Sequence, residues 1–272
     1  MHIETRGTGP ALVLIHGWAM HGGIFAPLVE RLQSRYQLHL VDLPGHGRSR
    51  DDASPLALAS VAERLATQVP RALWLGWSLG GLVALQAAQK NPDAVRGLIM
   101  LCASPRFVRD DSWPQGMDAS VFGNFADELA RDYRGTLDRF LMLEAQGSDQ
   151  VRTELRLLRE QLFAHGEPPA KTLCEGLEIL QSSDLRAGLP TLAMPSLWIA
   201  GRRDRLVSPA AMRTSADRAR CARYVEIQSG GHAPFLTHAD EVVAALDAFV
   251  EKLPSDGDDA VSAAGHLRTR PA

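Results

Sequence analysis

The sequence has little of what marks membrane, secreted or nucleic-acid-binding proteins. Its 272 residues include only three cysteines, Cys102, Cys174 and Cys221, whose wide spacing fits neither a disulfide framework nor a zinc site. No apolar run reaches the roughly 18 residues of a membrane-spanning helix, and the polar segment 1–10 lacks a signal-peptide pattern. The 29 basic residues nearly balance the 32 acidic ones, so no net charge attracts the chain to nucleic acid or membranes. We therefore expect a cytoplasmic monomer with reduced thiols.

What the sequence does have is an alternation of short apolar runs and amphipathic stretches. The apolar runs predict buried strands, and the amphipathic stretches that mostly follow them predict crossover helices. The expected strands are Ala11–Ile15, Leu38–Asp42, Ala72–Gly76, Gly97–Cys102, Ser196–Gly201 and Tyr224–Gln228, and the expected helices are Phe25–Ser34, Ala57–Val69, Gly80–Lys90, Pro209–Ala219 and Asp240–Leu253. This alternation indicates an α/β fold with a mostly parallel sheet covered by helices on both faces.

The alternation fails in residues 105–189, where strand signals disappear and helical periodicity takes over. We expect a helical insertion there, between the two parts of one α/β core, residues 1–104 and 190–253. Such an insertion emerges near the carboxyl ends of the strands, where open α/β sheets bind ligands, so it is placed to act as a lid. Residues 254–272 show no periodicity and are expected to form a disordered tail.

A G-x-S-x-G pentapeptide, residues 76–80, lies between an expected strand and an expected helix. Glycines at both ends permit a sharp strand-to-helix turn that leaves the serine oxygen exposed, and the helix amino terminus favours negative charge that develops nearby. We therefore expect Ser78 to be a nucleophile. For the pentapeptide alone, the alternative is a Gly/Ser turn without chemistry.

A serine nucleophile needs a histidine base and an acid that orients the histidine. Asp204 follows the expected strand Ser196–Gly201, and His232 follows the last expected strand within G-G-H-A-P. The chain order Ser, Asp, His is typical of α/β-hydrolases. For Asp204, a helix cap or a surface ion pair is the alternative. Asp42 also ends a strand, but we interpret it as scaffold because it lies in a turn-rich stretch before the nucleophile.

The negative oxygen of an acyl-transfer intermediate needs two backbone N–H donors. Leu79, which follows the nucleophile, is expected to supply one. Trp18 is expected to supply the second, because Gly17 in the H-G-W segment lets the loop after the first predicted strand fold toward the serine. The Trp18 indole either lines an acyl pocket or packs beneath the lid.

The segments H-G-W, D-L-P-G-H-G-R-S, G-W-S-L-G-G, G-R-R-D and G-G-H-A-P resemble the α/β-hydrolase superfamily. More closely, L-H-L-V-D-L-P-G-H-G-R-S, A-L-W-L-G-W-S-L-G-G-L-V-A and G-L-E-I-L-Q-S-S-D-L-R resemble the BioH family of biotin synthesis. Members of that family are pimeloyl-acyl-carrier-protein methyl ester carboxylesterases, which remove the methyl cap of the acyl chain. The resemblance implies the same reaction, an acyl-carrier protein as partner, and no metal or organic cofactor.

The resemblance also implies which residues contact the substrate and the carrier protein. The implied substrate contacts are Trp18, Ser78, Leu79, His232 and the lid residues Phe140, Leu141, Met142, Leu143 and Glu144. The implied carrier contacts are Arg139, Arg152 and Arg156. The family can have a further arginine four positions before Arg139, where this chain has Gly135.

Helical periodicity in residues 151–163 partly supports a carrier surface. An apolar face is expected from Val151, Leu155, Leu158 and Leu162, beside a stripe of Arg152, Arg156 and Arg159. This stripe suits the phosphate and carboxylates of an acyl-carrier protein. Because Glu160 follows Arg156 by four residues, a solvated face with local ion pairs is the alternative.

Other functions remain compatible with the same residues. A general short-chain carboxylesterase or thioesterase uses the same triad, and a hydrolase fold can also serve as a receptor for a small ligand. Dehalogenase and epoxide hydrolase chemistry is disfavoured, since those relatives have an aspartate where this chain has Ser78.

Overall fold

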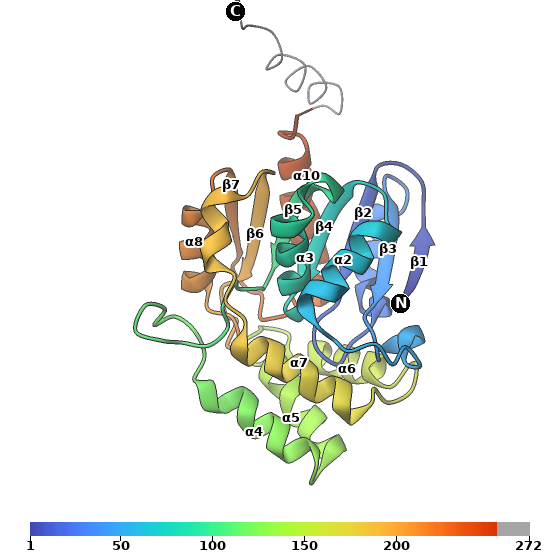
Figure 1. Ribbon diagram of the computed structural model, residues 1–272, viewed down its shortest axis with the longest axis vertical. Coiled ribbons are helices and arrows are strands. Elements are labelled where there is room, and N and C mark those ends of the chain that lie inside the picture. Colours follow the sequence, from blue (N-terminus) through green and yellow to red (C-terminus); the bar gives the residue numbers. More distant parts are fainter. Residues whose placement is uncertain (255–272) are drawn as a thin grey trace, which may run out of the picture.

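A single seven-stranded sheet forms the centre of the protein (Figure 1). The computed structural model describes residues 1–254, so the tail expected at 254–272 lies, apart from Pro254, outside the described residues. The strand order is β1-β3-β2-β4-β5-β6-β7, with bounds β1 His2–Arg6, β2 Ala11–Ile15, β3 Gln37–Asp42, β4 Ala72–Trp77, β5 Val95–Leu101, β6 Ser196–Gly201 and β7 Ala222–Ile227. Only the β1–β3 pair is antiparallel within these described strands. The carboxyl ends of the six parallel strands therefore meet at one edge of the sheet.

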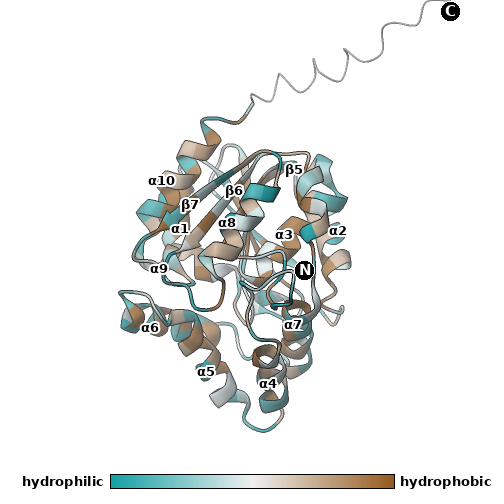
Figure 2. Cartoon of the chain, turned by 90° about the vertical axis from the view of Figure 1, so that its left-hand side faces the viewer, coloured by the Kyte–Doolittle hydropathy of each residue, from teal (hydrophilic) through white to brown (hydrophobic). Residues whose placement is uncertain are grey.

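Helices cover both faces of this sheet. α1 (Ala26–Leu32) packs on α10 (Ala239–Val250) over one face, and α2 (Leu58–Gln68), α3 (Leu79–Lys90) and α8 (Pro209–Arg218) lie over the other (Figures 1 and 2). All six residues of β4 and of β6 are buried, as expected for strands covered on both sides. The α/β prediction of a mostly parallel, doubly covered sheet is confirmed.

β1 is the strand that the sequence prediction missed. Its residues, H-I-E-T-R, are half-buried or exposed, because β1 is an edge strand that pairs only with β3. A search for apolar runs does not detect such a polar edge strand. The other strands start or end within two residues of their expected bounds. The helix expected at Phe25–Ser34 is instead a 3-10 turn, Gly22–Phe25, followed by α1.

Residues 105–189, the helical insertion, lie at the carboxyl ends of the strands (Figure 1). The insertion contains α4 (Ala119–Leu129), α5 (Tyr133–Ala145), α6 (Val151–Leu162) and α7 (Ala170–Ser182). α4 packs on α5 and α7, and α5 packs on α6. A 3-10 segment, Arg186–Thr191, then leads back toward β6. Between residues 1 and 254, no helix is long and apolar enough to cross a membrane.

The buried face of α6 differs from the face that the sequence predicts. Leu158 and Leu162 are buried as expected, but Val151 is 38% exposed and Leu155 is only partly buried. Glu154 is buried instead, because its carboxylate accepts hydrogen bonds from Ser148 Oγ and Thr237 Oγ1. The buried face of α6 therefore includes Glu154, an acidic residue that hydropathy alone assigns to the solvent-exposed face.

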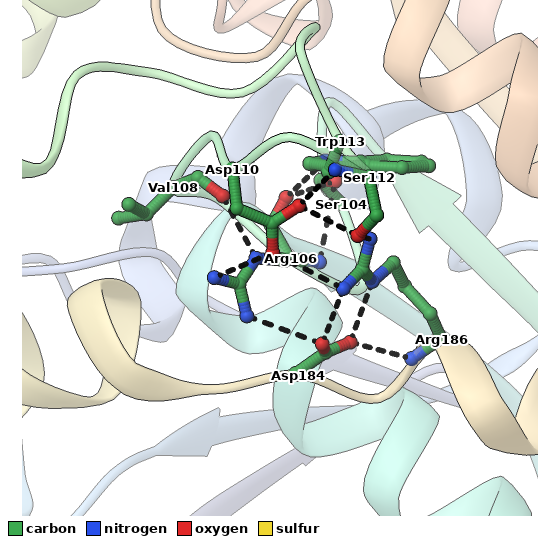
Figure 3. A network of polar contacts seen from close by, with 8 residues as sticks. All are labelled: Ser104, Arg106, Val108, Asp110, Ser112, Trp113, Asp184 and Arg186. Carbon is green, nitrogen blue, oxygen red and sulfur yellow. Dashed lines mark hydrogen bonds and ion pairs between the residues drawn. The ribbon is translucent and has the colours of Figure 1, made fainter.

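A cluster of ion pairs joins the beginning of the insertion to its end (Figure 3). Arg106 pairs with Asp110 at 3.0 Å and with Asp184 at 3.1 Å. Arg186 pairs with Asp184 at 2.6 Å and lies over the ring of Trp113. We call these five residues the hinge cluster. Since they lie where the chain leaves and re-enters the core, they fix the position of the insertion.

Candidate active site

Ser78 occupies a strained turn between β4 and α3. Its backbone has φ 54° and ψ −120°, a conformation that residues with a Cβ rarely adopt. A Cβ at Gly76 would collide with the carbonyl of Gly80, and a Cβ at Gly80 would collide with the carbonyl of Ile15. The two glycines of the pentapeptide are thus required sterically, and the turn holds Ser78 at the carboxyl edge of the sheet.

The structure brings Ser78, His232 and Asp204 together from three loops. His232 Nε2 lies 2.9 Å from Ser78 Oγ, and His232 Nδ1 lies 2.8 Å from Asp204 Oδ2. Asp204 Oδ1 accepts hydrogen bonds from the backbone N–H groups of Leu206 and Val207. Asp204 therefore orients the imidazole and makes no ion pair with either neighbouring arginine among the described residues.

The surroundings of His232 favour its protonated form. Burial lowers its pKa, but the negative charge of Asp204 and the hydrogen bond to it outweigh burial, so the pKa of His232 is raised overall. With Nδ1–H donating to Asp204, Nε2 is free to accept the proton of Ser78. The arrangement supports nucleophilic attack by the serine oxygen.

Leu79 and the loop that carries Trp18 lie next to Ser78. Leu79 is the first residue of α3, and its N–H belongs to the helix-terminal groups that have no intrahelical partner. The loop after β2 lies against the turn, because a Cβ at Gly17 would come within 3.2 Å of Ser78 Cβ. The Trp18 N–H makes no hydrogen bond to another described residue. Both donors are thus available beside Ser78.

The Trp18 indole packs beneath the helical insertion. Its Nε1–H donates to the carbonyl of Leu173 in α7 at 2.8 Å, and its ring lies 4.3 Å from the ring of Phe140 in α5. A Cβ at Gly176, the first residue of the G-L-E-I-L segment, would come within 2.7 Å of the indole. Packing beneath the insertion, one of the two sequence interpretations, is what the structure shows.

Buried histidines and Asp42 hold the loops beside the turn. His16 Nε2 accepts from the Leu43 N–H at 3.0 Å, and its Nδ1–H donates to the carbonyl of Gly17. Burial holds the pKa of His16 well below its usual range, so the ring is neutral. Asp42 accepts from the backbone N–H groups of Gly22 and Arg48, which agrees with its interpretation as scaffold.

The lid residues implied as substrate contacts divide between the two sides of α5. Phe140, Leu141 and Glu144 are buried, Leu143 is partly buried, and Met142 is 44% exposed. The structure does not bring Met142 to the site, because consecutive residues of a helix point in different directions. Ser78 and His232 have no exposed surface, so the site is closed to solvent in this structure.

The three arginines implied as carrier contacts are exposed on α5 and α6. Arg139 pairs with Glu128 at 2.7 Å and with Asp132 at 3.2 Å, and Arg156 pairs with Glu160 at 2.7 Å. Arg152 makes no ion pair within residues 1–254. The surface therefore has features of both sequence interpretations. It carries exposed arginines, and two of them form local ion pairs with acidic residues.

Cys102 lies beside the triad, with its thiol 3.7 Å from the carbonyl oxygen of Gly231. Cys102 is buried, Cys174 is half-buried and Cys221 is exposed, and all three are free thiols. In the described part of the chain, no group of three His, Cys, Asp or Glu residues is arranged to hold a metal ion.

Comparison with known proteins agrees with this geometry. The family model of the α/β hydrolase fold matches residues 10–239. The pimeloyl-[acyl-carrier protein] methyl ester esterase of Xanthomonas campestris pv. campestris (strain B100) is 60% identical over 254 residues, which cover 93% of this chain and 100% of that protein. The protein of the same name from Stenotrophomonas maltophilia (strain R551-3) is 58% identical over 258 residues, covering 94% and 99%.

Solved structures with low sequence identity share the fold. An esterase from Exiguobacterium antarcticum superposes with a TM-score of 0.83 at 22% identity, covering 92% of this chain and 95% of that one. The enol-lactonase from Burkholderia xenovorans LB400 gives 0.80 at 21% identity, covering 92% and 96%. By its family match and its curated relatives, this chain belongs to the α/β-hydrolase family and, within it, to the BioH family of esterases.

Proposed function

We propose that this protein hydrolyses the methyl ester of pimeloyl-acyl-carrier protein and releases methanol, a step of biotin synthesis. The observation that carries the proposal is 60% identity to a curated esterase of that name over its whole length. The hydrogen-bonded arrangement of Ser78, His232 and Asp204 supports it, because ester hydrolysis needs an activated nucleophile and a proton carrier. The three free thiols fit the reducing cytoplasm, where we place the protein as a monomer.

The proposed reaction has two acyl-transfer steps. His232 Nε2 takes the proton of Ser78 while Oγ attacks the ester carbonyl carbon, and the N–H groups of Leu79 and Trp18 stabilise the resulting oxyanion. His232 then gives its proton to the departing methoxide, which leaves as methanol. Water then attacks the acyl-serine while His232 takes a proton from it, and His232 returns this proton to Ser78 Oγ as the free acid leaves. Asp204 remains ionised throughout and stabilises the imidazolium.

The helical insertion is proposed to act as a lid. Since Ser78 and His232 have no exposed surface, a substrate reaches them only when α5 and α7 move away from Trp18. The methanol that leaves is small, so selectivity must come from the acyl channel under the lid and from the surface that receives the carrier. Closing of the lid over the acyl chain would exclude bulk water from the reacting atoms.

Arg139, Arg152 and Arg156 are proposed as the carrier-binding surface of the lid. They project from neighbouring helices, and the partners of Arg139 and Arg156 are exposed carboxylates. Such surface ion pairs are weak, so a carrier that brings its own phosphate and carboxylates can replace them. The effect is expected on carrier affinity and association rate more than on the chemical step.

Methanol release from pimeloyl-acyl-carrier-protein methyl ester tests the proposal. Ser78→Ala is expected to lower kcat by roughly four to six orders of magnitude, because the nucleophile is lost. Replacement of the three lid arginines by alanine is expected to raise the apparent KM by about tenfold while kcat for a small free ester is unchanged.

A matched variant controls for loss of charge. Arg31, Arg35 and Arg64 also form surface ion pairs, but they lie outside the insertion, and their triple alanine variant is expected to keep the wild-type KM. Hydrolysis of free esters without turnover of the carrier-linked ester would reject the proposed substrate and leave the serine mechanism intact.

A further inference from the structure

Three buried carboxyl groups surround His232. Asp204 belongs to the loop after β6, Glu144 to the last turn of α5, and Glu154 to α6. Glu144 and Glu154 have no exposed surface, and Asp204 is buried too. Asp204 accepts a hydrogen bond from His232, and in their ionised forms Glu144 and Glu154 would also raise the pKa of the imidazole. A catalytic triad requires only one of these acids.

The three acids differ in their hydrogen-bond partners. Asp204 accepts from His232 and from two backbone N–H groups, as an ionised carboxylate should. Glu154 accepts two hydroxyl hydrogen bonds at Oε1, while its Oε2 has no partner. Neither oxygen of Glu144 has a hydrogen-bond partner in the described residues. A buried carboxylate without donors is strongly unfavourable, so Glu144 is the acid that must be neutral.

Electrostatics agree with this assignment. Burial raises the pKa of Glu144 to about 8 from its ordinary value of 4.5; the nearby His232 acts in the opposite direction, and Asp204 and Glu154 add to the increase. The carboxyl end of α5 also disfavours negative charge there. Glu154 in turn faces His238 and Asp149, which lie 3.4 Å apart. The thiol of Cys102 interacts with Asp204 and Glu154, and burial raises its pKa, so it stays protonated.

The three residues from 147 to 149 lie against both loops of the triad. A Cβ at Gly147 would collide with the carbonyl of Arg203, Ser148 packs on Gly231, and the N–H of Asp149 donates to Ser229 at 3.3 Å. If this end of α5 separates from the two loops, water reaches Glu144.

We propose that Glu144 must carry a proton for the active site to close, so that loss of this proton sets the alkaline limit of activity. Glu144 is thereby a positioning residue, since it acts through the closed state and not on the reacting atoms. The proposal rests on the proposed role of Ser78 and His232. In the open site Glu144 faces water and is ionised at neutral pH, and closure takes up one proton from solution.

The direction of the pH effect follows from linkage. The pKa of Glu144 is higher in the closed site than in the open site, so protonation favours closure. This contribution is complete below pH 4.5 and is lost as the pH rises through about 8. Above that pH, closure buries a second negative charge beside Asp204, so turnover stays low.

The test is the pH profile of kcat/KM for methyl butyrate, an uncharged ester, followed by methanol release. The wild type is expected to lose activity as the pH rises toward about 8, by up to about tenfold per pH unit, and to stay low above it. Glu144→Gln keeps the shape of the side chain without the charge, and is expected to remove this alkaline loss. Glu160→Gln removes an exposed carboxylate of the same insertion and should behave like the wild type. An alkaline loss that persists in Glu144→Gln overturns the proposal.

Infrared spectroscopy of the wild type makes the test independent of the variant. A protonated buried carboxyl group gives a carbonyl band in the infrared spectrum. We expect this band in a sample held one pH unit below the Glu144 pKa of about 8, and we expect it to be absent well above that pH. A spectrum without such a band also overturns the proposal. Ser78→Ala separates the two hypotheses: if it still releases methanol, the serine mechanism fails, whereas Ser78-dependent turnover with an unchanged alkaline loss rejects only the role of Glu144.

Discussion

Trp77 connects the turn that carries Ser78 to the loop that carries His232. Its indole Nε1–H donates to the carbonyl of His232 at 2.8 Å, and its ring lies 5.1 Å from the ring of Phe235. The residue immediately before the nucleophile thus fixes the backbone of the proposed base. The sequence marks this tryptophan only as part of a resemblance motif, because its partner lies 155 positions away.

Trp77→Phe is expected to lower kcat for a small ester by about tenfold with little change in KM, since it removes the N–H but keeps most of the aromatic packing. Steady-state kinetics measure the two parameters separately. Trp198→Phe is the matched control, because the Trp198 indole donates to Ser196 Oγ within β6. Equal losses of kcat in the two variants would mean that the contact with His232 has no special role.

At the scale of elements, the hinge cluster places the insertion over the sheet. Asp184 accepts from Arg106 and Arg186, and these side chains are only partly exposed. The chain contacts the core near both ends of a long helical segment, so these ion pairs restrict how the segment opens. Their geometry is the structural basis for treating the insertion as one moving part.

Asp184→Asn is expected to loosen this connection, because the amide cannot neutralise the two guanidinium groups. We expect faster proteolytic cleavage within residues 105–189 and a loss of stability of roughly 1 kcal/mol, the upper range for partly exposed pairs. Limited proteolysis and thermal unfolding measure these effects. Asp111→Asn, which changes an exposed acid next to Asp110 of the hinge cluster, is the control. A protease pattern identical to that of wild type would contradict the prediction.

The sequence predicts elements well where hydropathy decides and poorly where tertiary contacts decide. The buried strands, the G-x-S-x-G turn and the order of Ser78, Asp204 and His232 follow from local patterns. β1 does not follow from a local pattern, because its residues are half-buried or exposed. The burial of Glu144 and Glu154 does not either, since an acid in a helix pattern is assigned to the outer face unless the surrounding residues are known.

At the scale of the whole molecule, burial of the site makes entry of a substrate a separate step from the chemical reaction. Ser78 has no exposed surface, so we expect a reagent to reach it only after the proposed lid opens. Inactivation by a small fluorophosphonate is expected to reach a plateau rate as its concentration rises, because opening becomes limiting. Stopped-flow or quenched labelling measures this rate. A rate that stays proportional to concentration throughout would show that opening is fast compared with the reaction.

The two edge strands have a consequence for how the molecules behave together. An unpaired strand edge can recruit a strand from another copy unless charge prevents it. β1 carries Glu4 and Arg6, and Glu4 is paired with both Arg6 and Arg48. At the other edge, β7 carries Glu226, which is paired with Arg202. A concentrated solution of this protein should therefore resist edge-to-edge polymerisation, because each added strand would bury charges of both signs.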